Sequence, residues 1–441
     1  MSVKSERIRK VNSYKVLSDL KFRLIVEGIF VGLITGVIVS LFRFILQEVE
    51  FDRQGIINIA KTSFGVALLW ILVLIILLTI CAFIVRKEPL VSGSGIPQVK
   101  GELVANIKPN WLRVLILKFF GSICAISAGL SLGREGPSIQ LGAMVGKGMS
   151  RLSGRLINEE KYLVMCGAGA GLAAAFGAPL AGVIFVLEEI KRKFSHKALL
   201  CTMSGAITAD WVASRVFGLD PVFNIDLEGD FPLKYFWVLI IFGILLGICS
   251  AIYIKATKIT LSVLKPLRKN NIIWILTGLI IIGLAIIYPS VLGSGHSLIE
   301  TVCNPKDFTI SSLFVLLIIK FLFSIYSFGT GAPGGTLQPI LVIGGIIGSL
   351  FGMLVCNYTG IPNDFIPYFV VFGMVGYFSG IVRSPITGIL IITEITGMQV
   401  SLFHLAIPSL IAYIIAELLH TKPVYDMLLD NILRENPKYV R

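Results

Sequence analysis

Long apolar runs occur along the whole chain and restrict what it can fold into. They lie at residues 24–39, 64–85, 112–132, 162–187, 235–253, 272–288, 313–328, 340–355 and 402–418. Several approach the roughly 20 residues that cross a bilayer as one helix, and the shorter ones predict interrupted or half-spanning helices. We therefore expect one all-α, polytopic membrane protein.

The distribution of charge predicts how the chain crosses the membrane. The chain is 55% hydrophobic, and its net charge of +13 could suggest nucleic-acid binding. The cations instead gather in the N- and C-terminal segments and at residues 86–87, 191–193 and 265–269, whereas acidic residues occupy the turns at 48–52 and 220–230. This alternation follows the positive-inside rule and predicts that both termini are cytoplasmic. It indicates no nucleic-acid surface.

A charged motif, Gly133-Arg134-Glu135-Gly136-Pro137, follows one apolar run and opens another. An ionisable side chain inside a membrane is costly and usually functional. The glycines let backbone N–H groups approach a ligand, and the proline suits the first turn of a helix. Because a helix start attracts anions, Glu135 is predicted to act as a gate that occupies an anion site. The alternative is a structural pair between Arg134 and Glu135.

A second irregular motif, Gly93-Ser94-Gly95-Ile96-Pro97, places a hydroxyl between two glycines. Irregular backbone at membrane depth is tolerated where it is buried in protein or lines a cavity. We therefore expect Ser94 to face a ligand. The alternative is that Ser94 caps a helix.

The two halves of the chain repeat four features. Residues 93–95 recur at 293–295, Lys118 at Lys320, residues 133–137 at 335–339, and residues 179–188 at 385–394. The separations are 200, 202, 202 and 206 residues, which is an almost constant register. A duplicated membrane domain with matching interrupted helices predicts a transporter whose site lies between the repeats.

The expected organisation is therefore a basic N-terminal segment (1–22), a first repeat (23–216), an acidic extracellular linker (217–233), a second repeat (234–430) and a short C-terminal tail (431–441). The glycine-rich segments at 142–148 and 167–171 lack the spacing of a nucleotide-binding loop. The scattered cysteines and histidines match neither a metal site nor a hydrolase. We expect no cofactor, no metal, no nucleotide and no enzymatic activity.

The combination of these motifs resembles the CLC family of chloride channels and transporters, over about residues 22–430. The resemblance is carried by Gly93-Ser94-Gly95-Ile96-Pro97, Gly133-Arg134-Glu135-Gly136-Pro137, Gly335-Thr336-Leu337-Gln338-Pro339 and Tyr425. It implies an inverted-repeat fold with many tilted helices, in a homodimer with one anion pathway per subunit. It also implies a multi-pass protein of a prokaryotic plasma membrane, without the paired nucleotide-binding modules of many relatives.

The same resemblance assigns roles to individual residues. It places chloride at Ser94, at Tyr425 and at the backbone of the segment that contains Thr336 and Leu337, and it makes Glu135 the outer gate. Glu189 matches the inner proton-transfer glutamate of the exchangers. The alternative for Glu189 and its neighbour Glu188 is an ion pair with the cations at 191–193 at a helix end.

This chain departs from the family pattern at four positions. Thr336 and Leu337 stand where relatives usually have isoleucine and phenylalanine, which predicts a looser and more polar pocket. Gln98 and Lys100 replace residues that are often acidic in bacterial members, which predicts a changed charge in the inner vestibule.

The function predicted from these observations is proton-coupled chloride exchange. A passive, gated chloride channel of the same fold is the first alternative, and a membrane sensor without transport is the second. The small hydroxyl of Ser94 between glycines predicts that chloride permeates much better than fluoride.

Overall fold

The structure is a computed structural model that describes residues 3–105, 107–192, 194–223, 225, 231–304, 308–397 and 402–435, with side chains from residue 21 onward except that of residue 158. These residues form 17 α-helices and no β-strand, which confirms the all-α prediction. Much of the expected acidic linker (224 and 226–230) and the end of the expected C-terminal tail (436–441) lie outside the described residues.

The helices form two series of eight, followed by one more. The first series is α1 (Val3–Thr62), α2 (Phe64–Lys87), α3 (Ile96–Val104), α4 (Trp111–Ser127), α5 (Glu135–Leu152), α6 (Ile157–Phe176), α7 (Pro179–Phe185) and α8 (His196–Phe217). The second series is α9 (Phe236–Lys269), α10 (Ile272–Ile287), α11 (His296–Cys303), α12 (Ile310–Gly329), α13 (Leu337–Thr359), α14 (Ile366–Val382), α15 (Pro385–Thr396) and α16 (Leu402–Leu418). The chain ends with α17 (Val424–Glu435), and a π-helix (Val186–Lys191) continues α7. Helix α1 shows no break at residue 22, where the sequence suggested a boundary.

Six helices among the described residues are long and apolar enough to cross a membrane: Lys21–Thr62 of α1, α2, Leu233–Lys269 around α9, α12, α13 and Asn363–Val382 around α14. Others are too short. Helix α3 has 9 residues and α11 has 8. At about 1.5 Å per residue, such helices cover less than half of a hydrocarbon core of roughly 30 Å. The prediction of half-spanning helices is therefore confirmed.

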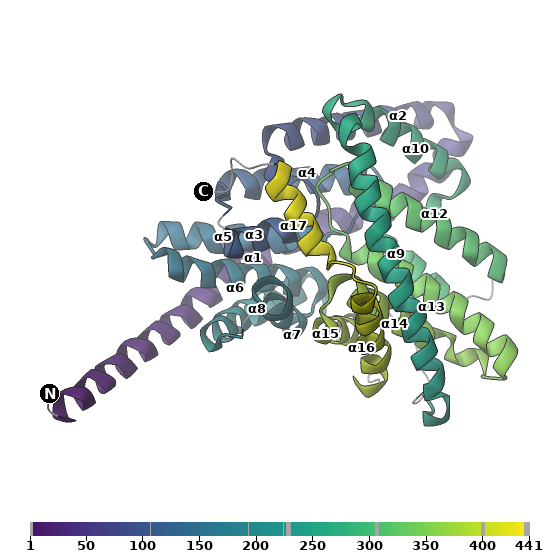
Figure 1. Ribbon diagram of the computed structural model, residues 1–441. Coiled ribbons are helices and arrows are strands. Elements are labelled where there is room, and N and C mark those ends of the chain that lie inside the picture. Colours follow the sequence, from purple (N-terminus) through teal and green to yellow (C-terminus); the bar gives the residue numbers. More distant parts are fainter. Residues whose placement is uncertain are drawn as a thin grey trace.

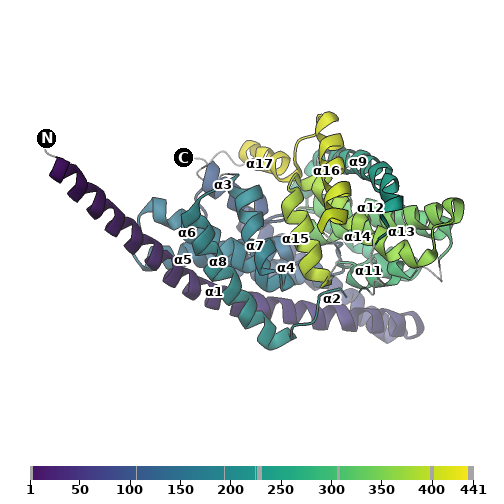
Figure 2. The same cartoon turned by 90° about the horizontal axis from the view of Figure 1, so that it is seen from below.

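The two series pack in the same way. Helix α5 lies against α6 and α1 against α8, and in the second half α13 lies against α14 and α9 against α16. Figure 1 shows the two halves side by side, with α17 crossing back to the first half, where it contacts α3. Figure 2 shows the same division from another side, with the N-terminal part of α1 extending outward.

The two halves meet directly at the motifs that recur in the sequence. The N–H of Gly133 donates to the carbonyl of Gly335 at 2.8 Å, and the N–H of Gly335 donates to the carbonyl of Gly133 at 2.7 Å. This exchange joins the loop before α5 to the loop before α13. The counterpart motifs of the two repeats are therefore in contact at the centre of the molecule.

Each half also caps a helix of the other. The carboxylate of Glu188 accepts hydrogen bonds from the N–H groups of Ile386 and Thr387 at 3.2 and 2.7 Å. Glu394, its counterpart, accepts hydrogen bonds from the N–H groups of residues 180–181 at 3.0 and 2.8 Å. These carboxylates satisfy free donors at the starts of α15 and α7. Among the described residues Glu188 makes no ion pair, and the carboxylate instead caps α15.

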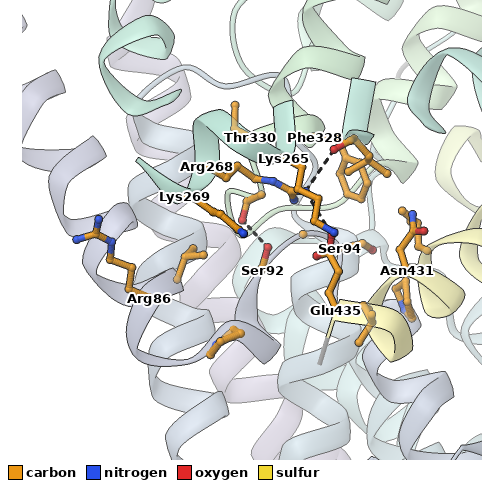
Figure 3. A pocket seen from close by; sticks show the side chains of 18 of the residues that line it. Arg86, Ser92, Ser94, Lys265, Arg268, Lys269, Phe328, Thr330, Asn431 and Glu435 are labelled. Atoms are coloured by element: carbon orange, nitrogen blue, oxygen red, sulfur yellow. Dashed lines mark hydrogen bonds and ion pairs between the residues drawn. The ribbon is translucent and has the colours of Figure 1, made fainter. Parts of the chain in front are cut away.

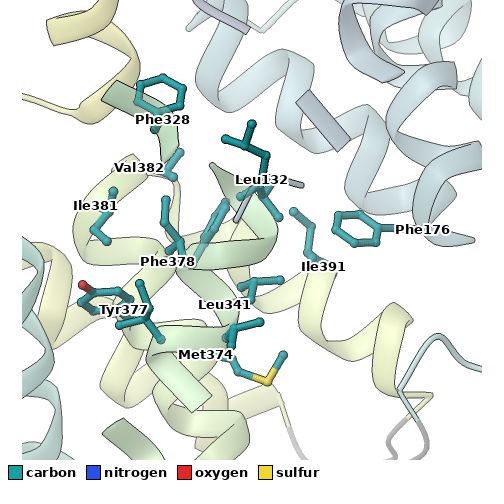
Figure 4. Packing of buried hydrophobic residues seen from close by; sticks show 14 of the residues in the cluster. Leu132, Phe176, Phe328, Leu341, Met374, Tyr377, Phe378, Ile381, Val382 and Ile391 are labelled. Atoms are coloured by element: carbon teal, nitrogen blue, oxygen red, sulfur yellow. The ribbon is translucent and has the colours of Figure 1, made fainter. Parts of the chain in front are cut away.

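The apolar core is shared by both halves. Leu132 and Phe176 of the first half belong to the same buried cluster as Leu341, Phe378 and Ile391 of the second (Figure 4). Burial differs strongly among the spanning helices. In the most apolar stretch of α14, 89% of the residues are buried, against 22% in α2. Helix α14 is thus an interior helix, whereas most of α2 is available to lipid.

Candidate functional site

Four helix starts carry the residues that the sequence singled out. Ser94 lies just before α3, and Glu135 is the first residue of α5. Thr336 is the N-cap of α13, and Tyr425 lies in the first turn of α17. Helix starts present unpaired N–H groups and a partial positive charge. Side chains from both halves of the chain are therefore placed beside groups that attract anions.

The first three starts are in close contact because of Gly136. A Cβ atom added there would lie 2.6 Å from the Ser94 hydroxyl oxygen and 3.0 Å from the Cα of Gly335. Only glycine allows backbone segments to approach so closely. The glycines of the Glu135 motif therefore allow the starts of α3, α5 and α13 to meet.

The hydroxyl groups at this junction lack protein partners. Ser94, Thr336 and Tyr425 are buried, and none of their hydroxyl oxygens has a hydrogen-bond partner among the described residues. Tyr425 and Thr336 nevertheless lie close enough to interact. Buried donors without partners are rare in folded proteins and indicate a bound ligand or water. Leu337 is also fully buried and belongs to the apolar core.

Lys118 holds the loop that carries Ser94. Its ammonium group donates to the carbonyl oxygens of Val91 and Gly93 at 2.9 and 2.6 Å. The side chain is fully buried, and these two carbonyl oxygens satisfy donors of its terminal nitrogen. Because the carbonyls are occupied, the N–H side of the loop remains available for another partner.

Glu135 has no exposed surface, and neither carboxylate oxygen has a hydrogen-bond partner among the described residues. The carboxylate lies near the backbone N–H of Gln338, so it faces the starts of both α5 and α13. Arg134 is buried, but it makes no ion pair within 4.0 Å among the described residues. The two charges still interact electrostatically, at a distance longer than an ion pair.

Glu189 has the opposite environment. Its side chain is fully buried and pairs with Lys100 at 2.7 Å and with Arg192 at 3.3 Å, and the Ser384 hydroxyl donates to it at 3.2 Å. Lys100 and Arg192 also pair with Asp426 of α17, at 2.5 and 2.7 Å. The expected ion pair between Glu189 and the cations at 191–193 is thus partly confirmed, through Arg192. Lys193 lies outside the described residues.

Sequence reasoning missed the main partner of Glu189. Lys100 was expected to change the charge of an inner vestibule, but its ammonium group faces Glu189 and Asp426. The two residues are 89 positions apart, and only the packing of α3 against the π-helix brings them together. The unusual cation at position 100 was the available signal.

A cavity of about 610 Å³ leads to Ser94. Gly93, Ser94 and Gln98 line one part of it, and Figure 3 shows basic side chains gathered around Ser92 and Ser94. The cations in its lining are Arg86, Lys265, Arg268, Lys269 and Arg434. Its one acidic lining residue, Glu435, pairs with Lys265 at 3.0 Å. A cavity lined in this way concentrates anions. Neither Lys100 nor Glu189 lines it.

Comparisons with known proteins extend over nearly the whole chain. Residues 77–417 match the family described as "Voltage gated chloride channel". A protein of Vibrio parahaemolyticus named H(+)/Cl(-) exchange transporter ClcA is 32% identical over 440 residues, which cover 97% of this chain and 93% of that protein.

Two solved structures are similar to this one. A slow cyanobacterial Cl⁻/H⁺ antiporter has a TM-score of 0.85 at 27% identity, with 94% of this chain and 99% of that chain covered. A CLC-type fluoride/proton antiporter has a TM-score of 0.72 at 24% identity, with 90% and 95% covered, and supports the fold alone. With its duplicated helices and its match over residues 77–417, the chain belongs to the CLC family of voltage-gated chloride channels.

Proposed function

We propose that this protein exchanges chloride for protons across a membrane. The observation that carries the proposal is the position of Glu135, a buried carboxylate without a hydrogen-bond partner at the start of α5 and facing that of α13. A bound anion and the Glu135 carboxylate compete for the space at these helix starts, so occupation by one excludes the other. The names of the relatives, which are called H⁺/Cl⁻ exchange transporter and Cl⁻/H⁺ antiporter, support the same function.

Chloride would reach this place through the cavity lined by cations. The basic side chains raise the local concentration of anions, and the Ser94 hydroxyl in the cavity lining is a donor without a partner among the described residues. Ser94, Tyr425 and the backbone at Thr336 and Leu337 would then bind chloride. These donors are neutral, which keeps binding weak enough for release.

Glu135 would couple the two ions. In its ionised form the carboxylate stays at the helix starts and blocks chloride. Protonation removes the charge that the helix starts attract, so the side chain leaves and chloride enters. Return of the side chain expels chloride and releases the proton. Glu135 therefore either carries a proton away from the helix starts or occupies the anion site in its ionised form.

The proton would leave Glu135 by way of Glu189. An intramembrane carboxylate is a suitable proton acceptor in an otherwise apolar region. Glu189 lies outside the lining of the cationic cavity, so the two ions would share the path at Glu135 and separate on the inner side.

One observation favours the passive channel as a second candidate. Lys100 and Arg192 stabilise the negative form of Glu189 and so oppose its protonation. If they keep Glu189 permanently ionised, chloride would move without protons.

The proposal includes the setting of the protein. We place it in the plasma membrane of a prokaryote, with both termini on the cytoplasmic side and two identical subunits per assembly. The basic segments support the orientation, and the bacterial relatives support the membrane. Cross-linking in native membranes and labelling of cysteines added near each terminus test the subunit number and the orientation.

Reconstituted liposomes decide between exchanger and channel. In a chloride gradient without a pH gradient, an exchanger drives protons uphill, and an opposing pH gradient shifts the reversal potential away from that of chloride. Chloride flux with no coupled proton movement would establish the channel, and absence of both fluxes would favour a sensor. With fluoride in place of chloride, the flux should be much smaller.

A further inference from the structure

The loop at residues 293–295 has the same backbone form as the loop at 93–95. Gly93 and Gly95 have φ angles of 67° and 97°, and Gly293 and Gly295 have φ angles of 74° and 84°. These left-handed conformations favour glycine and set the direction of the residue between them. Ser294 therefore stands before α11 as Ser94 stands before α3.

A buried lysine holds the second loop as well. The ammonium group of Lys320 donates to the carbonyl oxygens of Val291 and Gly293 at 2.9 and 3.0 Å. Lys118 makes the corresponding pair of bonds in the first half. Both loops thus have carbonyl groups occupied by a lysine, and the serine between the glycines of each loop can donate to another partner.

The partner differs between the halves. Ser294 donates twice to one carboxylate oxygen of Glu50, from its N–H at 3.1 Å and from its hydroxyl at 2.6 Å. Ser94 makes no hydrogen bond through its hydroxyl among the described residues. A negatively charged group of the protein therefore occupies the second loop at the position that is open in the first.

The guanidinium group of Arg53, beside Glu50, has donors that the carboxylate does not use. The Arg53 guanidinium lies 3.5 Å from Glu50 and donates to the carbonyl of Leu292 at 3.2 Å. Arg53 is 7% exposed, and its Nε and Nη1 are buried without partners among the described residues. Arg134 and His296 also act electrostatically on Glu50. Buried donors without partners beside a helix start are what a bound anion would use.

We propose that Ser294, the start of α11 and Arg53 form a second anion-binding site, which the Glu50 carboxylate occupies in this conformation. The ligand is a small monovalent anion of halide size, because it takes the place of the one Glu50 carboxylate oxygen that Ser294 binds. The inference goes beyond proton-coupled exchange and does not depend on it, since binding is measured without transport.

The test uses bromide, whose anomalous X-ray signal identifies its position in crystals of the full chain. Wild-type protein soaked in bromide should show no peak at Ser294, whereas Glu50→Ala should show one. The double variant Glu50→Ala, Ser294→Ala should lose it. Glu48→Ala is the matched control, because it removes the same charge from the same helix at an exposed position and should leave the site empty.

A second variant keeps the test decisive if Glu50→Ala fails to fold. In Glu50→Ser the new side chain is also too short to reach Ser294, but it leaves a polar group on α1. This variant should bind bromide at Ser294 in the same way. If the folded variant shows no bromide at Ser294, or if the peak survives loss of the Ser294 hydroxyl without weakening, the inference is wrong. Bromide at Ser94 is a separate readout that tests the proposed chloride site.

Discussion

Two buried carboxylates in this protein have opposite surroundings. Glu135 lies at helix starts, with no hydrogen-bond partner and no ion pair among the described residues. Glu189 is held by Lys100, Arg192 and Ser384. Both side chains have no exposed surface, so burial alone does not distinguish them. The difference lies in directed partners: no hydrogen bond or ion pair holds the carboxylate of Glu135, whereas three side chains hold that of Glu189.

The largest effect is expected from Glu135→Gln, which removes the mobile charge and keeps the volume. Proton flux in liposomes should fall by roughly 100-fold or more, as expected for loss of a group that transfers protons. Chloride flux should continue and lose its pH dependence, because the neutral side chain no longer competes with the anion.

The same measurement contains its own check on folding. A Glu135→Gln protein that elutes normally on size exclusion but conducts no chloride would show that Glu135 has a structural role. Chloride flux that still depends on pH would place the gate elsewhere.

A smaller effect is expected from Glu189→Gln, which removes the fixed carboxylate. Proton uptake driven by a chloride gradient should fall at least about tenfold, which corresponds to ~1.4 kcal/mol in the barrier. Chloride flux should remain, because the cationic cavity does not include Glu189. Lys100 keeps Asp426 as a partner, so the variant should fold. Undiminished proton pumping would show that the inner route avoids Glu189.

Lys100→Gln removes one ion-pair partner of Glu189 and so makes its surroundings more like those of Glu135, which has no ion pair among the described residues. Without this cation the ionised form of Glu189 is less stabilised, so the carboxylate accepts a proton more readily. If protonation of Glu189 limits the rate, proton exchange in liposomes should rise about three- to tenfold.

Lys147→Gln provides the matched control for this variant. Lys147 is another buried lysine in an ion pair, with Glu102 at 2.7 Å, but it does not contact Glu189. Both substitutions break a buried pair, and only Lys100→Gln should accelerate proton movement. An equal change in both variants would attribute the effect to lost stability.

The smallest effect on transport is expected from Glu188→Gln, next to Glu189 in the chain. Glu188 caps α15, so the substitution should lower the free energy of unfolding by about 1–2 kcal/mol and leave the ratio of proton to chloride flux unchanged. Glu394→Gln removes the counterpart cap on α7 and should give a similar loss in thermal denaturation. A change in coupling for Glu188→Gln would extend the proton route to this residue.

Much of this arrangement could be predicted from local sequence. The glycines around Ser94 and Glu135 mark irregular backbone, and the almost constant separation of four features indicates a duplicated domain. The structure places both motifs at helix starts in contact, and it has the predicted short helices. These features could be predicted because glycine and proline determine the backbone conformation of neighbouring residues, and the length of an apolar run determines the length of a membrane helix.

Partners that meet only through packing could not be predicted. Glu188 and Glu189 are adjacent in the sequence, yet one caps a helix 199 residues away and the other pairs with a lysine 89 residues away. The side-chain directions within the π-helix separate them, and no periodicity in the sequence reveals that. The contact of Glu50 with Ser294 spans 244 residues and was missed for the same reason.

The reciprocal caps on α7 and α15 have a consequence for how the two halves of the chain depend on each other. Glu188 completes a helix of the second half, and Glu394 completes the equivalent helix of the first. Such an exchange is the contact pattern of a twofold-symmetric pair, in which identical surfaces satisfy one another. A chain cut between the two halves would leave each glutamate without its helix start and each helix start without its carboxylate. Each half therefore needs the other to complete one of its helix starts, as two subunits do at a symmetric interface.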